Sequence, residues 1–258
     1  MKTGIFLSYK GLGANLLHLS YCHQIAKKFG PVSLITLCPN LDKVLKDDPS
    51  FKEVIYLNKF HRKLFDLFKL SNFIKKFNFE NIFIFYPSVR HYLSSKLAGI
   101  KNIYHYPLLN KKNLHLVEAA KKFTEKSLDI KNCPTETKIY INTEKIKNLK
   151  KSDTNNIILG IGSSGPTTKW GYKNYIKLIK KLCKTHKCYF YLLCGPNEND
   201  DAQKIIQELG EDYCESLSNK SISEVKNYIF LSNLYIGNDS FGHHISSQMG
   251  KPSFIILL

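Results

Sequence analysis

Short apolar segments alternate with longer amphipathic segments along the whole chain of 258 residues. Apolar runs typical of buried strands occur at residues 4–9, 32–37, 53–57, 81–86 and near 103, and again at 157–161, 188–193, 234–236 and 253–258. Helical spacing of apolar residues predicts helices between them, at residues 14–29, 60–77, 91–98, 114–127, 172–185, 202–209, 222–231 and 242–249, with a short one through Val44 and Leu45. This alternation favours α/β architecture, with parallel sheets covered by helices on both faces.

A polar, lysine-rich segment at residues 142–155 interrupts the alternation, after one further strand end expected at 137–141. We therefore expect two Rossmann-like lobes, residues 1–150 and 151–258, with a cleft between them. The chain is long enough for two such domains of roughly 100–150 residues. Ligands of parallel sheets bind beyond the carboxyl ends of the strands, so the loops at those ends are the candidate sites.

The net charge of +17 is concentrated in the first half of the chain. Residues 1–150 hold 26 Lys and Arg against 11 Asp and Glu, whereas residues 151–258 hold 12 against 10. The imbalance predicts an anionic partner, although a compositional drift toward Lys, Asn and Ile explains part of it. Because no RNA-binding signature or recognition-helix motif is present, a membrane surface or an anionic substrate is favoured over nucleic acid.

The seven cysteines are scattered and form no C-x-x-C pair. This pattern supports neither a disulfide framework nor a zinc site, and we expect no metal. The apolar runs are too short to span a bilayer, and the N-terminus lacks a signal-peptide core. We therefore expect a cytoplasmic protein.

The loop after the first strand contains Gly11 and Gly13 and opens a helix. Glycines there permit positive φ and close approach of a ligand to the backbone. The dinucleotide-binding pattern G-x-G-x-x-G fails because position 16 is Leu. A plain tight turn is the simpler interpretation of this loop.

A loop at residues 160–170 is richer in groups that suit phosphate oxygens. It holds three glycines, the hydroxyl residues Ser163 and Ser164 with two threonines, and Lys169 before Trp170, which could also simply anchor the next helix. Hydroxyls and backbone N–H groups suit phosphate, and Lys169 supplies a positive charge. After the next strand, Glu198 could accept hydrogen bonds from a ribose diol, or could serve only to complement a helix dipole.

A third loop, at residues 238–244, precedes a predicted helix. Ser240 can cap that helix, whose first-turn N–H groups lack intrahelical partners and therefore suit an anion. The flanking residues add donors and a charge: Asn238, Asp239, Phe241, Gly242, His243 and His244. An ordinary strand–loop–helix turn would account for the segment equally well on its own.

Taken together, these loops resemble glycosyltransferase family 9, the heptosyltransferase-like enzymes of the GT-B fold. The resemblance rests on the order and spacing of Lys169-Trp170, the Gly-Pro-x-Glu loop ending at Glu198, and the Asn-Asp-Ser run from Asn238 with its following His244 and Gly250-Lys251-Pro252. It covers the chain from the first strand to the last residue.

The resemblance implies an inverting sugar transfer from a nucleotide-activated donor, commonly ADP-heptose, to a lipopolysaccharide core or related glycan. The C-terminal lobe would bind the donor, and the N-terminal lobe an anionic glycan or lipid-linked acceptor. The basic charge of the N-terminal lobe also suits peripheral contact with an anionic membrane. Carried over, Ser163, Ser164 and Lys169 would line the phosphates, Glu198 would contact the ribose, and the backbone from Asp239 to Gly242 would hold the diphosphate. No cofactor or metal is implied.

The sequence departs from the family pattern at several positions. The Asp proposed as the family's general base is replaced by Ala14, which leaves Asn15 and His18 as nearby polar residues, with His243 and His244 as further imidazoles. His18 could act as a base or could simply pack in its helix. Phe241 stands at a family Gly, with Gly242 one place later, and the chain stops at Leu258, so we expect a shortened C-terminal lobe.

Two other functions fit the same residues. A catalytically degenerate protein could hold a nucleotide sugar or an anionic glycan without transfer, as the substitution at Ala14 suggests. A sugar-nucleotide epimerase of similar two-lobed build is the third possibility, but the sequence offers no catalytic Glu/His pair for it. Of these three functions, we expect that the protein is a glycosyltransferase.

Overall fold

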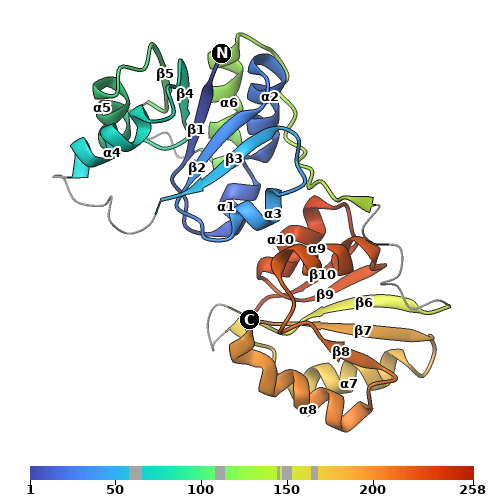
Figure 1. The fold of residues 1–258 in the computed structure, drawn as a ribbon. Coiled ribbons are helices and arrows are strands. Elements are labelled where there is room, and N and C mark those ends of the chain that lie inside the picture. Colours follow the sequence, from blue (N-terminus) through green and yellow to red (C-terminus); the bar gives the residue numbers. More distant parts are fainter. Residues whose placement is uncertain (58–65, 108–113, 144–145, 147–152, 164–167) are drawn as a thin grey trace. The chain divides into compact units, whose positions relative to one another are not determined.

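The fold was analysed in a computed structural model, which describes residues 1–57, 66–107, 114–143, 146, 153–163 and 168–258. The chain divides into two compact units, Met1–Lys138 and Ile139–Leu258. The boundary precedes the expected one at residue 150, and most of the expected linker, residues 144–145 and 147–152, lies outside the described residues. Figure 1 shows one sheet with its helices in each unit.

The N-terminal unit is a five-stranded parallel sheet in the order β3-β2-β1-β4-β5. Its strands are β1 (Thr3–Leu7), β2 (Val32–Thr36), β3 (Phe51–Tyr56), β4 (Asn81–Ile84) and β5 (Asn102–His105). Its helices are α1 (Leu12–Leu16), α2 (Leu19–Phe29), α3 (Leu41–Leu45), α4 (Asp66–Lys75), α5 (Val89–Leu97) and α6 (Leu116–Leu128). The central strands β1, β2 and β4 are buried along their whole length, as continuous apolar runs in a covered parallel sheet require.

The C-terminal unit repeats the plan with the strand order β10-β9-β6-β7-β8, again all parallel. Its strands are β6 (Asn155–Gly160), β7 (Cys188–Leu193), β8 (Cys214–Ser216), β9 (Leu234–Asn238) and β10 (Ser253–Ile256). Its helices are α7 (Tyr172–Leu182), α8 (Asn199–Leu209), α9 (Ile222–Leu231) and α10 (Phe241–Gln248), with a 3-10 turn at Pro196–Glu198. Helices α7 and α8 cover one face of the sheet, and α9 and α10 the other (Figure 1).

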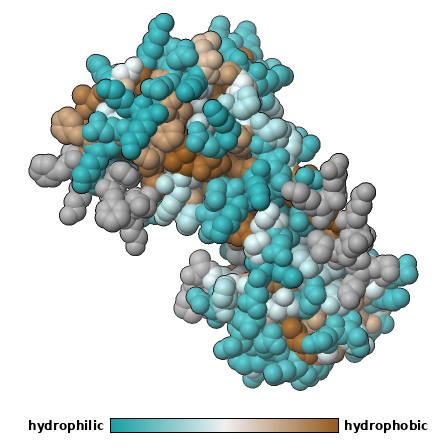
Figure 2. All heavy atoms as spheres, viewed as in Figure 1, coloured by the Kyte–Doolittle hydropathy of each residue, from teal (hydrophilic) through white to brown (hydrophobic). Residues whose placement is uncertain are grey.

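Apolar side chains from strands and helices fill each unit separately. In the N-terminal unit, Leu70 and Ile74 of α4 pack with Phe6 and Ile82 of the sheet. In the C-terminal unit, Tyr175 of α7 lies in a cluster with residues of β6, β7 and α8. Figure 2 shows hydrophilic residues over much of the visible face. Within the described residues, no helix combines the length and apolar character needed to cross a bilayer.

The expected helix at residues 14–29 is divided into α1 and α2 at His18. The His18 Nδ1 atom lies 2.6 Å from the Ala14 carbonyl oxygen, which in a regular helix would accept the His18 backbone N–H. That N–H donates to the Asn15 carbonyl instead, at 3.1 Å, which tightens the turn. Competition of a side chain for a helical carbonyl therefore accounts for the break.

Three other parts of the structure differ from the expected elements. The strand end expected at 137–141 is wrong, because these residues form no strand and pair with none of the described strands. Strand β8 was not predicted, since three residues without alternation carry too weak a signal. The helix expected at 60–77 is present as α4, but residues 58–65 lie outside the described part of the chain.

Candidate functional site

The carboxyl ends of neighbouring strands in the C-terminal unit surround a cavity of about 410 Å³. The sheet order places β9, β6, β7 and β8 side by side, so the loops after these strands meet at one edge. Its apolar lining includes Leu193, Leu217 and Phe241. Its polar lining residues are Ser163, Glu198, Ser218, Lys220 and Ser240. An apolar slot with a few convergent polar groups is the common form of a small-molecule site.

Glu198, which lines this cavity, contacts Lys169 from a different loop. Lys169 Nζ lies 3.4 Å from Glu198 Oε1, and both side chains are largely buried, with 30% and 15% exposure. The Gly195 backbone N–H donates to Glu198 Oε2 at 3.0 Å, which fixes the carboxylate. The structure thus brings together a cation and a carboxylate that lie far apart in the sequence.

The loop after β6 is described only in part. Ser163 lines the cavity, and its hydroxyl is hydrogen-bonded to that of Thr168. Ser164 lies outside the described residues, so its place in the site stays a prediction. Gly162 packs closely against the backbone of the next loop, because a Cβ there would lie 3.2 Å from the Cα of Cys194.

Asn238, at the end of β9, is completely buried and ties two loops together. Its Nδ2 donates to the Ile161 carbonyl at 3.1 Å, and its Oδ1 accepts from the Trp170 backbone N–H at 3.2 Å. The Tyr175 hydroxyl donates to the Gly160 carbonyl at 2.9 Å and lies 3.3 Å from the same Oδ1. These contacts give Asn238 a positioning role, since its amide holds the loop that carries Lys169.

The first turn of α10 faces the cavity through Ser240, Phe241 and Gly242. Ser240 occupies the N-cap position with extended backbone, but its side chain makes no capping hydrogen bond, contrary to the expectation from sequence. The helix has no acidic residue in its first turn. Backbone N–H groups there lack partners within the helix, so the turn can bind an anion.

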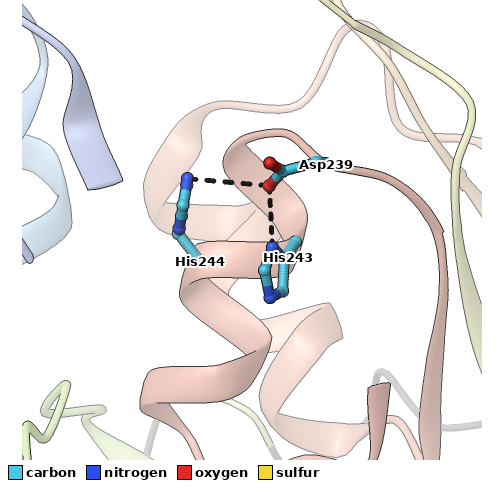
Figure 3. Close-up of side chains that lie close together, drawn as sticks. All are labelled: Asp239, His243 and His244. Carbon is cyan, nitrogen blue, oxygen red and sulfur yellow. Dashed lines mark hydrogen bonds and ion pairs between the residues drawn. The ribbon is translucent and has the colours of Figure 1, made fainter. Parts of the chain in front are cut away.

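Asp239, His243 and His244 gather at the outer side of the same turn (Figure 3). His243 Nδ1 lies 2.9 Å from Asp239 Oδ1, and His244 Nε2 lies 4.0 Å from the same oxygen. The two imidazole rings stack, with centroids 5.1 Å apart. Burial, followed by the neighbouring His243, lowers the pKa of His244.

In the N-terminal unit, the loop after β1 is held by Asn15, which is completely buried. Asn15 Nδ2 donates to the carbonyls of Tyr9 and Gly11, at 3.0 and 2.7 Å, and its Oδ1 accepts from the Thr36 hydroxyl at 3.0 Å. Neither Gly11 nor Gly13 adopts the positive φ that glycine permits. The polar atoms of Asn15 therefore serve to shape the loop.

His18 is completely buried, and its ring stacks on Tyr9 with centroids 4.8 Å apart. Its Nε2 atom has no hydrogen-bond partner among the described residues. Burial lowers the pKa of His18 to about 4, outweighing the opposing effect of the Ala14 carbonyl. The imidazole is therefore neutral at pH 7, and its free nitrogen faces the protein interior.

Residues that follow β8 form the cavity wall that sequence reasoning missed. Ser218 donates to Asn199 Oδ1 at 2.7 Å, which ties this loop to α8. Ser221 and Glu224 form a reciprocal capping box at the start of α9. That Ser-x-x-Glu pattern was visible in the sequence and could have located the loop before it.

A second cavity, of about 670 Å³, lies in the N-terminal unit between the end of β5 and α6. Tyr104, Tyr106 and Phe123 contribute to its apolar lining, and Lys122 and Lys126 to its polar lining. The Tyr106 hydroxyl is buried without a hydrogen-bond partner among the described residues. This cavity was not predicted from the sequence, because its lining comes from three separate segments.

Comparison with known proteins identifies a family and a fold. The family model for glycosyltransferase family 9 (heptosyltransferase) matches residues 90–256. No curated protein sequence matches the chain. Among solved structures, that of E. coli ADP-heptose LPS heptosyltransferase II has a TM-score of 0.77 at 16% identity, covering 100% of this chain and 85% of the other.

Two further structures show the same likeness of fold. The family 9 glycosyltransferase of Veillonella parvula has a TM-score of 0.77 at 16% identity, covering 98% of this chain and 80% of the other. The E. coli heptosyltransferase WaaC with ADP has a TM-score of 0.75 at 15% identity, covering 99% and 87%. The two parallel sheets of this chain thus match the GT-B-like fold of these structures, as the sequence predicted.

Proposed function

Because the chain belongs to glycosyltransferase family 9, we propose that it transfers a sugar from a nucleoside-diphosphate donor bound in the cavity of the C-terminal unit. One observation carries the proposal: Glu198 and the first turn of α10 line that cavity, and Lys169 contacts the Glu198 carboxylate. The arrangement supplies positive charge for a diphosphate and an acceptor for a ribose hydroxyl. The heptosyltransferase structures solved with ADP and with ADP-2-deoxy-2-fluoro heptose favour an ADP-linked sugar.

In the proposed complex, the diphosphate lies against the N–H groups at Phe241 and Gly242, where the helix dipole favours negative charge. Lys169 neutralises the leaving group as the bond between the sugar and the diphosphate breaks, and such stabilisation is a large term in catalysis. The Glu198 carboxylate accepts from the ribose. The apolar wall at Leu217, Ile222 and Val225 accommodates the base.

The acceptor is an anionic or lipid-linked glycan, and transfer inverts the anomeric centre. A hydroxyl of the acceptor attacks the anomeric carbon of the donor sugar from the face opposite the diphosphate, and this hydroxyl loses its proton to a base. The cavity beside α6 is the candidate acceptor site, because Lys122 and Lys126 accompany an apolar lining there. The excess of basic residues before position 150 suits the same anionic partner.

A donor-binding protein without transferase activity is the second candidate, favoured by a specific observation. Ala14 carries no proton acceptor, Asn15 uses its amide to hold the loop, and the free nitrogen of His18 is buried. Release of nucleoside diphosphate from ADP-heptose distinguishes the two functions. Turnover that is lost in His18→Asn would assign the base to His18, and binding without any turnover would support the second function.

Calorimetric titration with ADP, GDP and UDP tests the donor site. We expect one nucleotide to bind and Lys169→Ala to weaken it by roughly 10- to 100-fold, the range for hydrogen bonds to charged groups. Lys173→Ala is the matched control, because it removes an exposed lysine from the start of α7. Equal affinity in the Lys169 and Lys173 variants, or no binding of any nucleotide, would refute the proposal.

A further inference from the structure

The Asp239, His243 and His244 side chains form a compact set of metal-ligating groups on the C-terminal unit (Figure 3). One ligand atom from each residue lies within 4.8 Å of the others. Asp239 lies just before α10, and His243 and His244 lie in its first turn, so the carboxylate can reach both imidazoles. The side chains are 53%, 27% and 36% exposed, in that order, which leaves a path for an ion.

The spacing of the three groups suits a first-row divalent ion. Metal–ligand bonds of about 2.0–2.2 Å place neighbouring ligand atoms roughly 3–4 Å apart. The distances from Asp239 Oδ1 to His243 Nδ1 and His244 Nε2 are 2.9 and 4.0 Å. Small side-chain rotations therefore bring both imidazoles and the carboxylate onto one ion without a change in the backbone.

From this geometry we infer that Asp239, His243 and His244 bind a divalent cation of the Zn²⁺, Co²⁺ or Ni²⁺ class. Two imidazoles favour these ions over Mg²⁺ and Ca²⁺, which prefer oxygen ligands. The site departs from the expectation that the chain binds no metal, which rested on the cysteine pattern and on the family resemblance. It rests on these three side chains and does not depend on the proposed transferase function.

The surroundings predict a weak, exchangeable site. The positive end of the α10 dipole opposes a cation, and the single negative charge of Asp239 offsets it. Three protein ligands leave coordination positions for water or another oxygen ligand, as in open rather than structural zinc sites. The ion would lie on the same turn of α10 whose Ser240, Phe241 and Gly242 line the cavity.

Titration of the chelator-treated, full-length protein with Co²⁺ alone tests the inference. We expect visible absorption bands of nitrogen and oxygen ligation, one ion per chain, and competition by Zn²⁺. We expect Co²⁺ binding to weaken by roughly tenfold or more in each of His243→Ala, His244→Ala and the isosteric Asp239→Asn. Loss of a residue that only hydrogen-bonds to a metal ligand already weakens binding by roughly this much. His186→Ala is the matched control, because it removes an exposed imidazole elsewhere on the same unit.

Two results would overturn the inference. The first is absence of Co²⁺ and Zn²⁺ binding at millimolar metal. The second is binding that survives all three substitutions, including ligation by cysteine, which the strong near-ultraviolet band of a cobalt–thiolate bond would reveal. Circular dichroism of each variant confirms that loss of binding reflects the lost ligand and not unfolding. The metal is the only probe, so the outcome is independent of nucleotide binding.

Discussion

The close packing of Gly242, within the first turn of α10, provides a test of how the anion-binding turn is held in place. A Cβ at this position would lie 2.5 Å from Leu193 Cδ2 and 2.7 Å from Tyr235 Cε2. Tyr235 cannot move freely, because it is completely buried and its hydroxyl donates to the Asn238 carbonyl at 2.9 Å. In Gly242→Ala the strain must therefore be relieved by displacement of α10.

Two opposing effects determine how much Gly242→Ala changes the free energy of unfolding. Overpacking of a close-packed site costs about 1–3 kcal/mol, whereas alanine in place of glycine within a helix gains up to about 1 kcal/mol. We expect a net loss of about 1–2 kcal/mol in the free energy of unfolding of the C-terminal unit. Displacement of the turn should also weaken ADP binding by roughly tenfold, or about 1.4 kcal/mol.

Urea unfolding followed by circular dichroism measures the stability of Gly242→Ala, and calorimetry measures its affinity for ADP. Leu193→Ala provides the coupled control, because it removes the nearest clashing atom and should cost less in the Gly242→Ala background than alone. A variant more stable than the parent by about 1 kcal/mol would show that helix propensity dominates. The close-packing argument would then be wrong.

Three further predictions concern the N-terminal unit. Burial lowers the pKa of His18 to about 4 and of His91 to about 3, so these histidines are protonated in the unfolded chain before they are protonated in the folded protein as the pH falls below about 6.5. Urea unfolding should therefore show about 2 kcal/mol less stability per histidine at pH 5 than at pH 7.5, and His18→Asn should abolish the part of this loss that comes from His18. Gly11→Ala should change the urea midpoint little, because its Cβ would meet no atom within 4 Å and its φ is −77°; a loss above about 1 kcal/mol would contradict the geometry. Vesicles containing anionic lipid should bind the protein in a salt-sensitive manner, and salt-independent binding in a sedimentation assay would refute the electrostatic account.

Strand–helix alternation was sufficient to predict both parallel sheets, because buried parallel strands have a continuous apolar signature. Strand β8 was not predicted, because it is a short edge strand whose position depends on pairing with β7. The break between α1 and α2 could not be predicted either. It results from the His18 side chain taking the Ala14 carbonyl, and helical apolar spacing continues across it.

For the candidate site, the sequence indicated which loops lie at the carboxyl ends of the strands, but it did not indicate how the individual side chains lie. Lys169 and Glu198 were both expected near the donor, and the structure places them 3.4 Å apart. Asn238 and His18, also expected in the site, are completely buried. This burial could not be predicted, because a sequence does not reveal which way a polar side chain faces. The contribution of Ser218 and Lys220 was missed because they lie in the loop that follows β8, a strand that was not predicted.

A crystal structure of the protein grown with ADP tests the central claim most directly. We predict that the diphosphate lies at the backbone N–H groups of Phe241 and Gly242 and within reach of Lys169, with the ribose at Glu198. The base should occupy the apolar slot beside Leu217. ADP bound elsewhere, for example in the cavity beside α6, or a diphosphate turned away from α10, would contradict the proposed donor site.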